Sequence, residues 1–324
     1  MHAPPGGCTW RRMCRHLTEG AVAVRAGRAL AGLVLVALSA GCSSGGEASS
    51  PPLAPFDSAQ LRQTLVDRIL PLSLRAAVEQ TRINDVANCL EGRGFRVVRP
   101  SATGVTHELA LNSAVERLRY GIPATYQGEL GITAFLVASA TAGSSRVLPA
   151  DGENEAFLRA EIGDLVNGTG NLVSINTGTG VLEFDADGCV GASYLNLFMT
   201  TESIRLYTQL PSQLQSEVNA ALEGTGSVAA SLEAWSSCAE ESGETLTSPS
   251  EITTLIIDEF NMNGEAAAQR AERELAALLR RCETESGLFA AVATVQPSIE
   301  DQILADSDAL VVQLQQAAAD AASP

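Results

Sequence analysis

Cys89-Leu90-Glu91-Gly92-Arg93-Gly94 shows the pattern that decides the fold expected for this chain. Two later segments repeat its spacing of cysteine and glycine, Cys238-Ala-Glu-Glu-Ser-Gly243 and Cys282-Glu-Thr-Glu-Ser-Gly287. A glycine at this place supplies the left-handed residue that commonly follows the last turn of a helix. Each of the three cysteines is therefore expected in the last turns of a helix.

A fourth cysteine, Cys189, follows Gly188 and is expected at the start of a helix. In an exported chain, four cysteines favour two disulfides. In an antiparallel helix pair the start of one helix lies beside the end of the other. This favours Cys189 with Cys238 and leaves Cys89 with Cys282, while the other two pairings stay open. Redox or metal roles are disfavoured, because the chain has no C-x-x-C motif and no histidine near these thiols.

The rest of the pattern predicts a mainly α fold: a disulfide-stapled helical domain with a small β-hairpin and a short strand. Residues 95–98 form the strand, and 172–175 with 181–184 flank a Gly-rich turn. Apolar spacing and stop signals predict helices over about 57–70, 72–91, 107–120, 154–166, 189–206, 212–222, 227–240, 250–261, 264–284 and 297–320. Pro211 and Pro297 are expected in first turns, and Ser248 with Glu251 in a capping box. Residues 121–146 give no clear assignment.

The N-terminal part is typical of a bacterial lipoprotein signal peptide. Arg25 and Arg28 precede the apolar run Ala29–Leu38, which is too short to span a membrane, and Ser39-Ala40-Gly41-Cys42 follows. Small residues before the cut and a free thiol are what signal peptidase and the lipid-transfer enzyme need. The usual Leu three residues before the cysteine is replaced by Ser39. Ordinary secretion or an uncleaved anchor are the alternatives.

These features divide the chain into three parts. We expect residues 1–41 to be the signal peptide, with a translation start later than Met1, and residues 42–56 to hold the lipidated Cys42 and a Ser-, Gly- and Pro-rich disordered tether. Residues 57–324 are expected to form a single, mostly helical extracytoplasmic domain. Two or three acyl chains would hold it firmly on the outer face of the plasma membrane.

The charge of the chain disfavours nucleic acid as a partner. Removing residues 1–41 takes five Arg and one Glu from 21 basic and 38 acidic residues, which leaves 16 and 37, a net charge of −21. Such a chain repels nucleic acid and anionic lipid. A diffuse negative surface is more often only a solvated face than a site for cations or a basic partner. The chain has no lysine. Ser-x-x-Lys acylases, Schiff-base enzymes and Walker-A phosphate sites are therefore excluded.

Catalytic and metal-binding patterns are weak. His107 is the one histidine after the signal peptide, no G-x-S-x-G motif occurs, and a surface or capping role is expected for His107. Glu183, Asp185 and Asp187 alternate before Gly188 and resemble the start of a calcium loop, but Tyr194 stands where an EF-hand needs Glu. These three are weak metal candidates, and Asp187 is more simply a helix cap. No catalytic residue and no cofactor is assigned. Aromatic residues are only 4% of the chain, so a sugar-binding platform is disfavoured, and Trp235 is expected in the core.

Several segments resemble those of uncharacterised actinobacterial secreted lipoproteins with four structural cysteines. They are 88–95 around Cys89, 119–122, Gly188-Cys189, 235–238, and 271–273 leading to Cys282 and Gly287-Leu288. Leu90 and Ala239 stand where Met is common in that family. The resemblance implies an envelope protein whose cysteines are structural, and it implies no activity.

The sequence therefore favours a lipid-anchored extracytoplasmic protein without catalytic activity. It would bind the membrane through its lipid and an envelope protein partner as an accessory subunit of an envelope or transport complex. The alternative is a hydrolase that uses acidic residues, Glu183, Asp185 and Asp187 first, on envelope glycan or peptide.

Overall fold

The computed structural model describes residues 64–126, 130–142, 146–152, 154–164, 170–176 and 181–323. The expected signal peptide, the lipidation site Cys42, the tether and residues 57–63 lie outside the described residues. Within the described part the chain is mainly helical, with two small sheets and two disulfides, which confirms the predicted fold class. None of the described helices is long and apolar enough to cross a membrane.

Twelve helices are described. In chain order they are α1 Leu65–Ile69, α2 Leu72–Gly92, α3 Ala102–Arg117, α4 Ile132–Ala142, α5 Glu155–Ile162, α6 Cys189–Phe198, α7 Thr201–Glu223, α8 Gly226–Glu241, α9 Ser250–Asn263, α10 Glu265–Ser286, α11 Leu288–Asp306 and α12 Asp308–Ala322. The strands are β1 Val97–Val98, β2 Leu148–Pro149, β3 Leu172–Asn176 and β4 Val181–Asp185.

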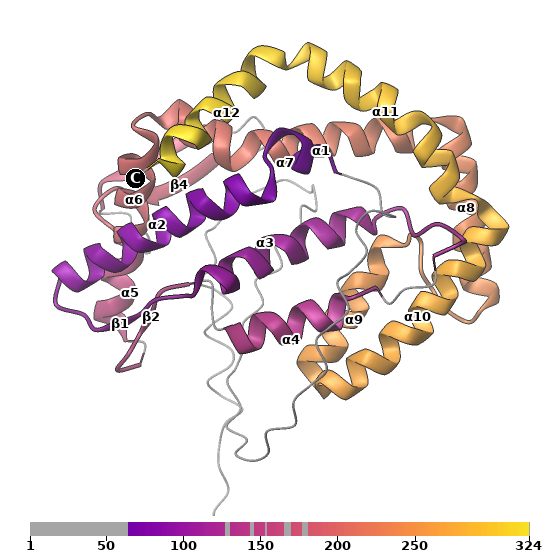
Figure 1. Ribbon diagram of the computed structural model, residues 1–324, viewed down its shortest axis with the longest axis horizontal. Helices are drawn as coiled ribbons and strands as arrows, with labels where there is room; N and C mark the ends of the chain where they lie inside the picture. The colour runs from indigo at the N-terminus through magenta and orange to yellow at the C-terminus, as the bar shows by residue number, and fades with distance from the viewer. Residues whose placement is uncertain are drawn as a thin grey trace, which may run out of the picture.

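Contacts between neighbouring helices close a ring, in an order that differs from the order along the chain (Figure 1). α2, α3 and α4 pack side by side, α4 contacts α9 and α10, and α10 contacts α8. α8 then contacts α11, and α12 returns to α2, so that the last helix of the chain lies beside one of the first. α7 packs against α1, α11 and α12. The N- and C-terminal helices thus belong to one packed body.

Both sheets are antiparallel pairs. β3 pairs with β4 from Leu172 opposite Asp185 to Asn176 opposite Val181, which confirms the predicted hairpin. β1 lies inside the predicted strand 95–98 and pairs with β2, with Val97 opposite Pro149. α4 falls in the region that gave no clear assignment, and β2 lies just after that region, where no strand was predicted.

Two predicted helix starts are wrong. Pro211 lies inside α7 and Pro297 inside α11 instead of in a first turn. A proline inside a helix costs about 3 kcal/mol. Burial of a continuous stripe along α7, which includes Leu210 and Leu214 on either side of Pro211, offsets that cost. The predicted helix 189–206 in fact breaks at Met199, which takes a left-handed conformation with φ 58°, and Thr200 then caps α7.

The three C-x4-G segments end helices as predicted. Gly94, Gly243 and Gly287 have positive φ angles of 88°, 89° and 62° and lie within two residues of the ends of α2, α8 and α10. Cys189 is the first residue of α6, also as predicted.

The favoured disulfide pairing is wrong. The bonds join Cys89 to Cys189 and Cys238 to Cys282, with Cα–Cα distances of 5.6 and 5.5 Å. The rule that a helix start meets a helix end holds for the first bond, but with α2 as the partner of α6. The second bond joins two helix ends, because the last turns of α8 and α10 converge. The prediction did not allow for two helix ends that meet.

The core has a large and a small part. The large cluster lies among the helices of the ring and includes Trp235, which is fully buried as expected. The small cluster surrounds Cys189 and Phe157, where Phe95 meets Phe157 edge to face at 5.5 Å. The Cys89–Cys189 bond therefore lies at the small cluster, where α2, α5 and α6 meet.

Candidate functional site

The acidic segment singled out in the sequence lies at the end of β4, directly before α6. Asp185 is 2% exposed, and its carboxylate accepts hydrogen bonds from the backbone N–H of Asp164 at 2.7 Å and of Asp187 at 2.9 Å. A buried carboxylate needs such donors, because burial without them is costly. The side chain of Asp185 therefore ties the end of β4 to the end of α5.

Four glycines allow this close approach to Asp185. A Cβ atom at Gly163 or Gly170 would lie 2.3 or 2.0 Å from the Oδ2 atom of Asp185, and one at Gly191 would lie 2.0 Å from its carbonyl oxygen. A Cβ at Gly188 would lie 2.6 Å from the backbone of Ile162. We call Asp185 with these four glycines the glycine cradle. Its glycines come from the end of α5, the residues before β3 and the start of α6.

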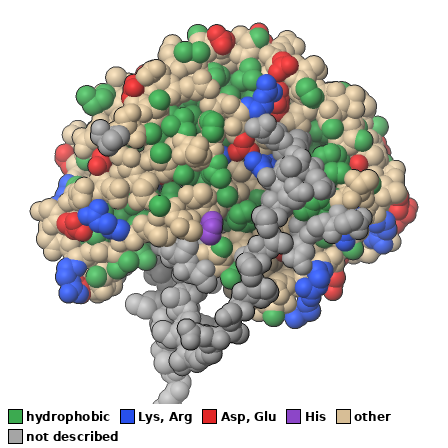
Figure 2. Space-filling model, in the orientation of Figure 1, with side chains coloured by type: hydrophobic (Ala, Val, Ile, Leu, Met, Phe, Trp, Pro, Cys, Tyr) green, Lys and Arg blue, Asp and Glu red, His purple; other side chains and the backbone are tan. Residues whose placement is uncertain are grey.

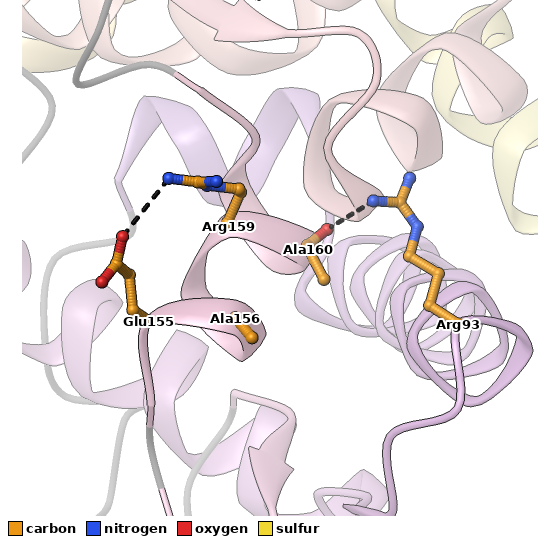
Figure 3. Close-up of a pocket in the computed structure, with 5 residues that line it drawn as sticks. All are labelled: Arg93, Glu155, Ala156, Arg159 and Ala160. Carbon is orange, nitrogen blue, oxygen red and sulfur yellow. Dashed lines mark hydrogen bonds and ion pairs between the residues drawn. The ribbon is translucent and has the colours of Figure 1, made fainter.

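An open hollow of about 500 Å³ lies beside the cradle, lined by Arg93, Glu155, Ala156, Arg159 and Ala160 (Figure 3). Arg93, just after α2, donates to the carbonyl oxygens of Ala160 and Asp187. Arg159 pairs with Glu155 at 3.3 Å and with Asp164 at 3.2 Å. Arg93 thus joins the end of α2 to α5 and to the segment before α6, whereas Arg159 pairs within α5 and with the residues that directly follow it. The hollow is shallow, and its charged groups already have protein partners.

The structure does not bring the three predicted metal candidates together. Asp185 is enclosed, Glu183 is exposed on the hairpin and accepts from the hydroxyl of Ser174 at 3.1 Å, and the exposed Asp187 follows the strand. Glycine, not Asp187, is the cap residue of α6, and no side chain makes the cap hydrogen bond there. Within the described ranges no group of three or more His, Cys, Asp or Glu side chains could hold a metal ion.

Other buried carboxylates also hold structural elements together. Glu272 on α10 accepts from the backbone N–H of Gly131 at 2.5 Å and of Thr133 at 2.8 Å, and so caps the start of α4. Glu283 accepts from the N–H of Phe289 at 2.8 Å in the first turn of α11, and burial raises the pKa of its carboxyl. Glu161 binds Arg146, and Glu300 binds Arg68 at 2.6 Å.

A buried ion-pair network joins α1, α2 and α3. Asp67 accepts from Arg75 at 2.6 Å, from Arg117 at 2.8 Å and from the hydroxyl of Ser113 at 3.1 Å. Burial alone would raise the pKa of the Asp67 carboxyl, but the hydrogen bond and charge of Arg117, the hydroxyl of Thr64 and the charge of Arg75 together lower it. Asp67 is therefore ionised in the folded chain at neutral pH.

Sequence reasoning missed an aromatic row where α6 and α7 meet α2. Phe184, Tyr194, Phe198 and Tyr207 follow one another with ring centroids 6.1, 6.3 and 4.8 Å apart. Arg82 lies 5.4 Å from the centre of the Tyr194 ring, and Glu79 accepts from the Tyr207 hydroxyl at 3.2 Å. Burial raises the pKa of both tyrosines. Four aromatic residues within 184–207, in an aromatic-poor chain, were the signal that could have revealed this row.

His107 is neither a cap nor a fully exposed side chain. It lies on the half-buried side of α3, where its Nδ1 atom has no hydrogen-bond partner, and Ser101 caps that helix instead.

On the face shown in Figure 2, acidic and basic side chains lie in small, scattered groups with hydrophobic side chains between them. On this face the negative charge is not gathered into one patch.

No protein-family model, no curated protein and no solved structure matches the chain. Its resemblance to the actinobacterial lipoproteins therefore stays a prediction from the sequence.

Proposed function

We propose that the chain is a lipid-anchored extracytoplasmic protein that binds an envelope protein partner without catalysing a reaction. In this proposal Cys42 carries the lipid and the helical domain serves as an accessory subunit of an envelope or transport complex. The order of Arg residues, apolar run and Cys42 supports the anchor. Two disulfides support an oxidising location outside the cytoplasm.

One structural observation carries the binding role. The buried carboxylates Asp67, Asp185, Glu272 and Glu300 each accept hydrogen bonds from the backbone or from arginines of other segments. These contacts fix the relative positions of helices that lie far apart in the sequence. A rigid body of this kind presents its surface in one shape, which lowers the cost of ordering on binding.

The hydrolase alternative draws no support from the three acidic residues named for it. The Asp185 carboxylate is enclosed in the glycine cradle, so a substrate could reach it only after the ends of α5 and β4 separated. Glu183 and Asp187 are exposed and are the residues to test. We expect the unmodified chain to hydrolyse cell-wall glycan or peptide no faster than a blank without protein. Glu183→Gln with Asp187→Asn should not change that rate. Hydrolysis that depends on these two side chains would refute the binding proposal.

The anchor and the partner are tested in native cells. The full chain should be recovered with the membranes at a mass raised by the lipid, and Cys42→Ala should release it into the soluble fraction. Cross-linking before solubilisation should then recover one defined membrane complex. A chain of unmodified mass among cytosolic proteins, with free thiols, would refute the proposal.

A further inference from the structure

α9 and α10 form a surface groove that takes no part in the contacts described above. Leu275 and Leu278 from α10 are buried and form its apolar floor, and Leu255 and Met262 from α9 are exposed apolar residues of its lining. The groove has a volume of about 500 Å³. Leu255 is 39% exposed and Met262 is 72% exposed, so apolar surface is left open to water.

The lining residues of α9 recur at one helical spacing. Leu255, Asp258, Glu259 and Met262 stand at positions i, i+3, i+4 and i+7 and therefore form one stripe. Seven residues of helix span about 10 Å. On this stripe the two acids lie between the two apolar residues, so an occupant along it would meet Leu255 and Met262 with apolar anchors about two helical turns apart and would carry basic residues beside those anchors.

The charged residues that line the groove, which we call its rim, are mainly acidic. Glu244, Asp258, Glu259 and Glu274 carry four negative charges, against one positive charge on Arg281, which donates to the hydroxyl of Ser242. The net charge at the rim is therefore −3. These acids lie beside the apolar residues of the groove and would face the polar flanks of an occupant.

The negative charge of the rim favours some kinds of binding partner over others. A second copy of the chain pairing through the same groove would set two acidic rims against each other, which costs several kcal/mol. An anionic membrane would be repelled for the same reason. A helix whose apolar face is flanked by Arg or Lys complements both the floor and the rim. The unbranched side chain of Met262 can adapt to anchors of different shape.

We propose that the α9–α10 groove binds an amphipathic helix of a partner protein, with an apolar face flanked by basic residues. This inference rests on the proposed binding function and names its surface and the chemistry of its partner. The Cys238–Cys282 bond joins α8 and α10 beside Ser242 and Arg281, and so fixes one end of the groove before the partner arrives.

The probe is a synthetic 14-residue helical peptide with Leu at i, i+4, i+7 and i+11 and Arg on both flanks. Its binding to the full chain is measured by fluorescence anisotropy at low salt. A peptide with Glu in place of Arg should bind at least tenfold more weakly. Met262→Gln should weaken binding of the Arg peptide at least fivefold, whereas Met199→Gln should not change it. Met199 is 81% exposed and lies outside the groove, so it is a matched control.

A second pair of variants separates the groove from the overall charge. Asp258→Asn, Glu259→Gln and Glu274→Gln together remove three charges from the rim. Glu285→Gln, Asp306→Asn and Asp308→Asn together remove three exposed charges elsewhere. The rim variant should weaken peptide binding at least tenfold and the control variant less than threefold. Equal losses from the two variants, or no loss with Met262→Gln, would overturn the groove proposal.

The outcomes also separate this inference from the proposed function. If a defined membrane complex is recovered and the rim variant still forms it, the binding function stands and the groove is not the binding site. Peptide binding at the groove, without any complex in native cells, would retain the groove and refute the accessory role.

Discussion

Gly191 shows how a single side chain could disrupt the glycine cradle. It lies inside α6, where Ala would normally be favoured over Gly by about 1 kcal/mol. Here a Cβ would meet the carbonyl oxygen of Asp185 at 2.0 Å and the Phe184 ring at 2.9 Å, and a backbone oxygen cannot move alone. We expect Gly191→Ala to lower the free energy of unfolding by about 2 kcal/mol, within the range for overpacked interiors.

The control for this substitution is Gly226→Ala. Gly226 lies at the start of α8 with no atom within 4 Å of a new Cβ. This variant should be neutral, or stabilised by up to about 1 kcal/mol. Urea denaturation of both variants measures the difference. If Gly191→Ala unfolds at the same urea concentration as Gly226→Ala, the close approach at Asp185 does not exist.

Asp67 makes stability depend on pH. Its pKa is lower in the folded chain than its ordinary value of 3.8, so the folded chain gains stability from the ionised form. That gain is complete above pH 3.8 and is lost as the pH falls through the folded pKa. Asp67→Asn leaves Arg75 buried without its charge partner and should cost about 3 kcal/mol at pH 7. The difference in free energy of unfolding between Asp67→Asn and the unmodified chain should become smaller below pH 3.8.

Asp301→Asn is the matched control for Asp67→Asn. Asp301 also pairs with an arginine, Arg68, but its side chain is 69% exposed. Exposed ion pairs contribute less than about 1 kcal/mol. Thermal unfolding at pH 7 and at pH 2.5 measures both variants. If the loss of stability caused by Asp67→Asn is the same at both pH values, the charge of Asp67 does not have the role given to it.

At the scale of elements, α4 depends on a cap from another helix. Glu272 on α10 accepts the N–H groups of Gly131 and Thr133, where the backbone of a helix start carries partial positive charge. Glu272→Gln should lower the free energy of unfolding by about 1–2 kcal/mol, as loss of a cap does. Hydrogen exchange at the start of α4 should become faster. Glu285→Gln, at an exposed position of α10, should leave both unchanged.

The distance along the chain between a structural signal and the element that it affects explains which elements could be predicted. The ends of α2, α8 and α10 were predictable, because the signal for each, a glycine with positive φ, lies within five residues of its cysteine. α4 was not, because the acceptor for its first turn lies 139 residues from Thr133. Pro211 was misleading because burial along α7 outweighs its local preference.

The candidate site was predictable to a similar degree. The alternating carboxylates correctly drew attention to Asp185, but not to its role as a buried acceptor. Gly188 and Gly191 follow it within six residues, whereas Gly163 and Gly170 approach it from the end of α5 and the residues before β3. Only the packed structure brings these segments together.

At the scale of the whole molecule, the two disulfides restrain different parts of the ring. Cys89–Cys189 closes a loop of 100 residues and joins the first helices to α6, whereas Cys238–Cys282 closes one of 44 residues on the far side. In the chain-entropy model these bonds stabilise by about 5 and about 4 kcal/mol. The first bond, at the smaller core cluster, has less buried apolar surface beside it to hold its helices together.

We therefore expect Cys89→Ser with Cys189→Ser to lower the melting temperature more than Cys238→Ser with Cys282→Ser. Hydrogen exchange should quicken around α5 and α6 in the first variant, and at the ends of α8 and α10 in the second. Peptide mapping without reduction should recover Cys89 linked to Cys189. A peptide that links Cys89 to Cys282 would contradict this pairing, because α2 would then have to meet the end of α10 and could not lie against the start of α6 as it does here.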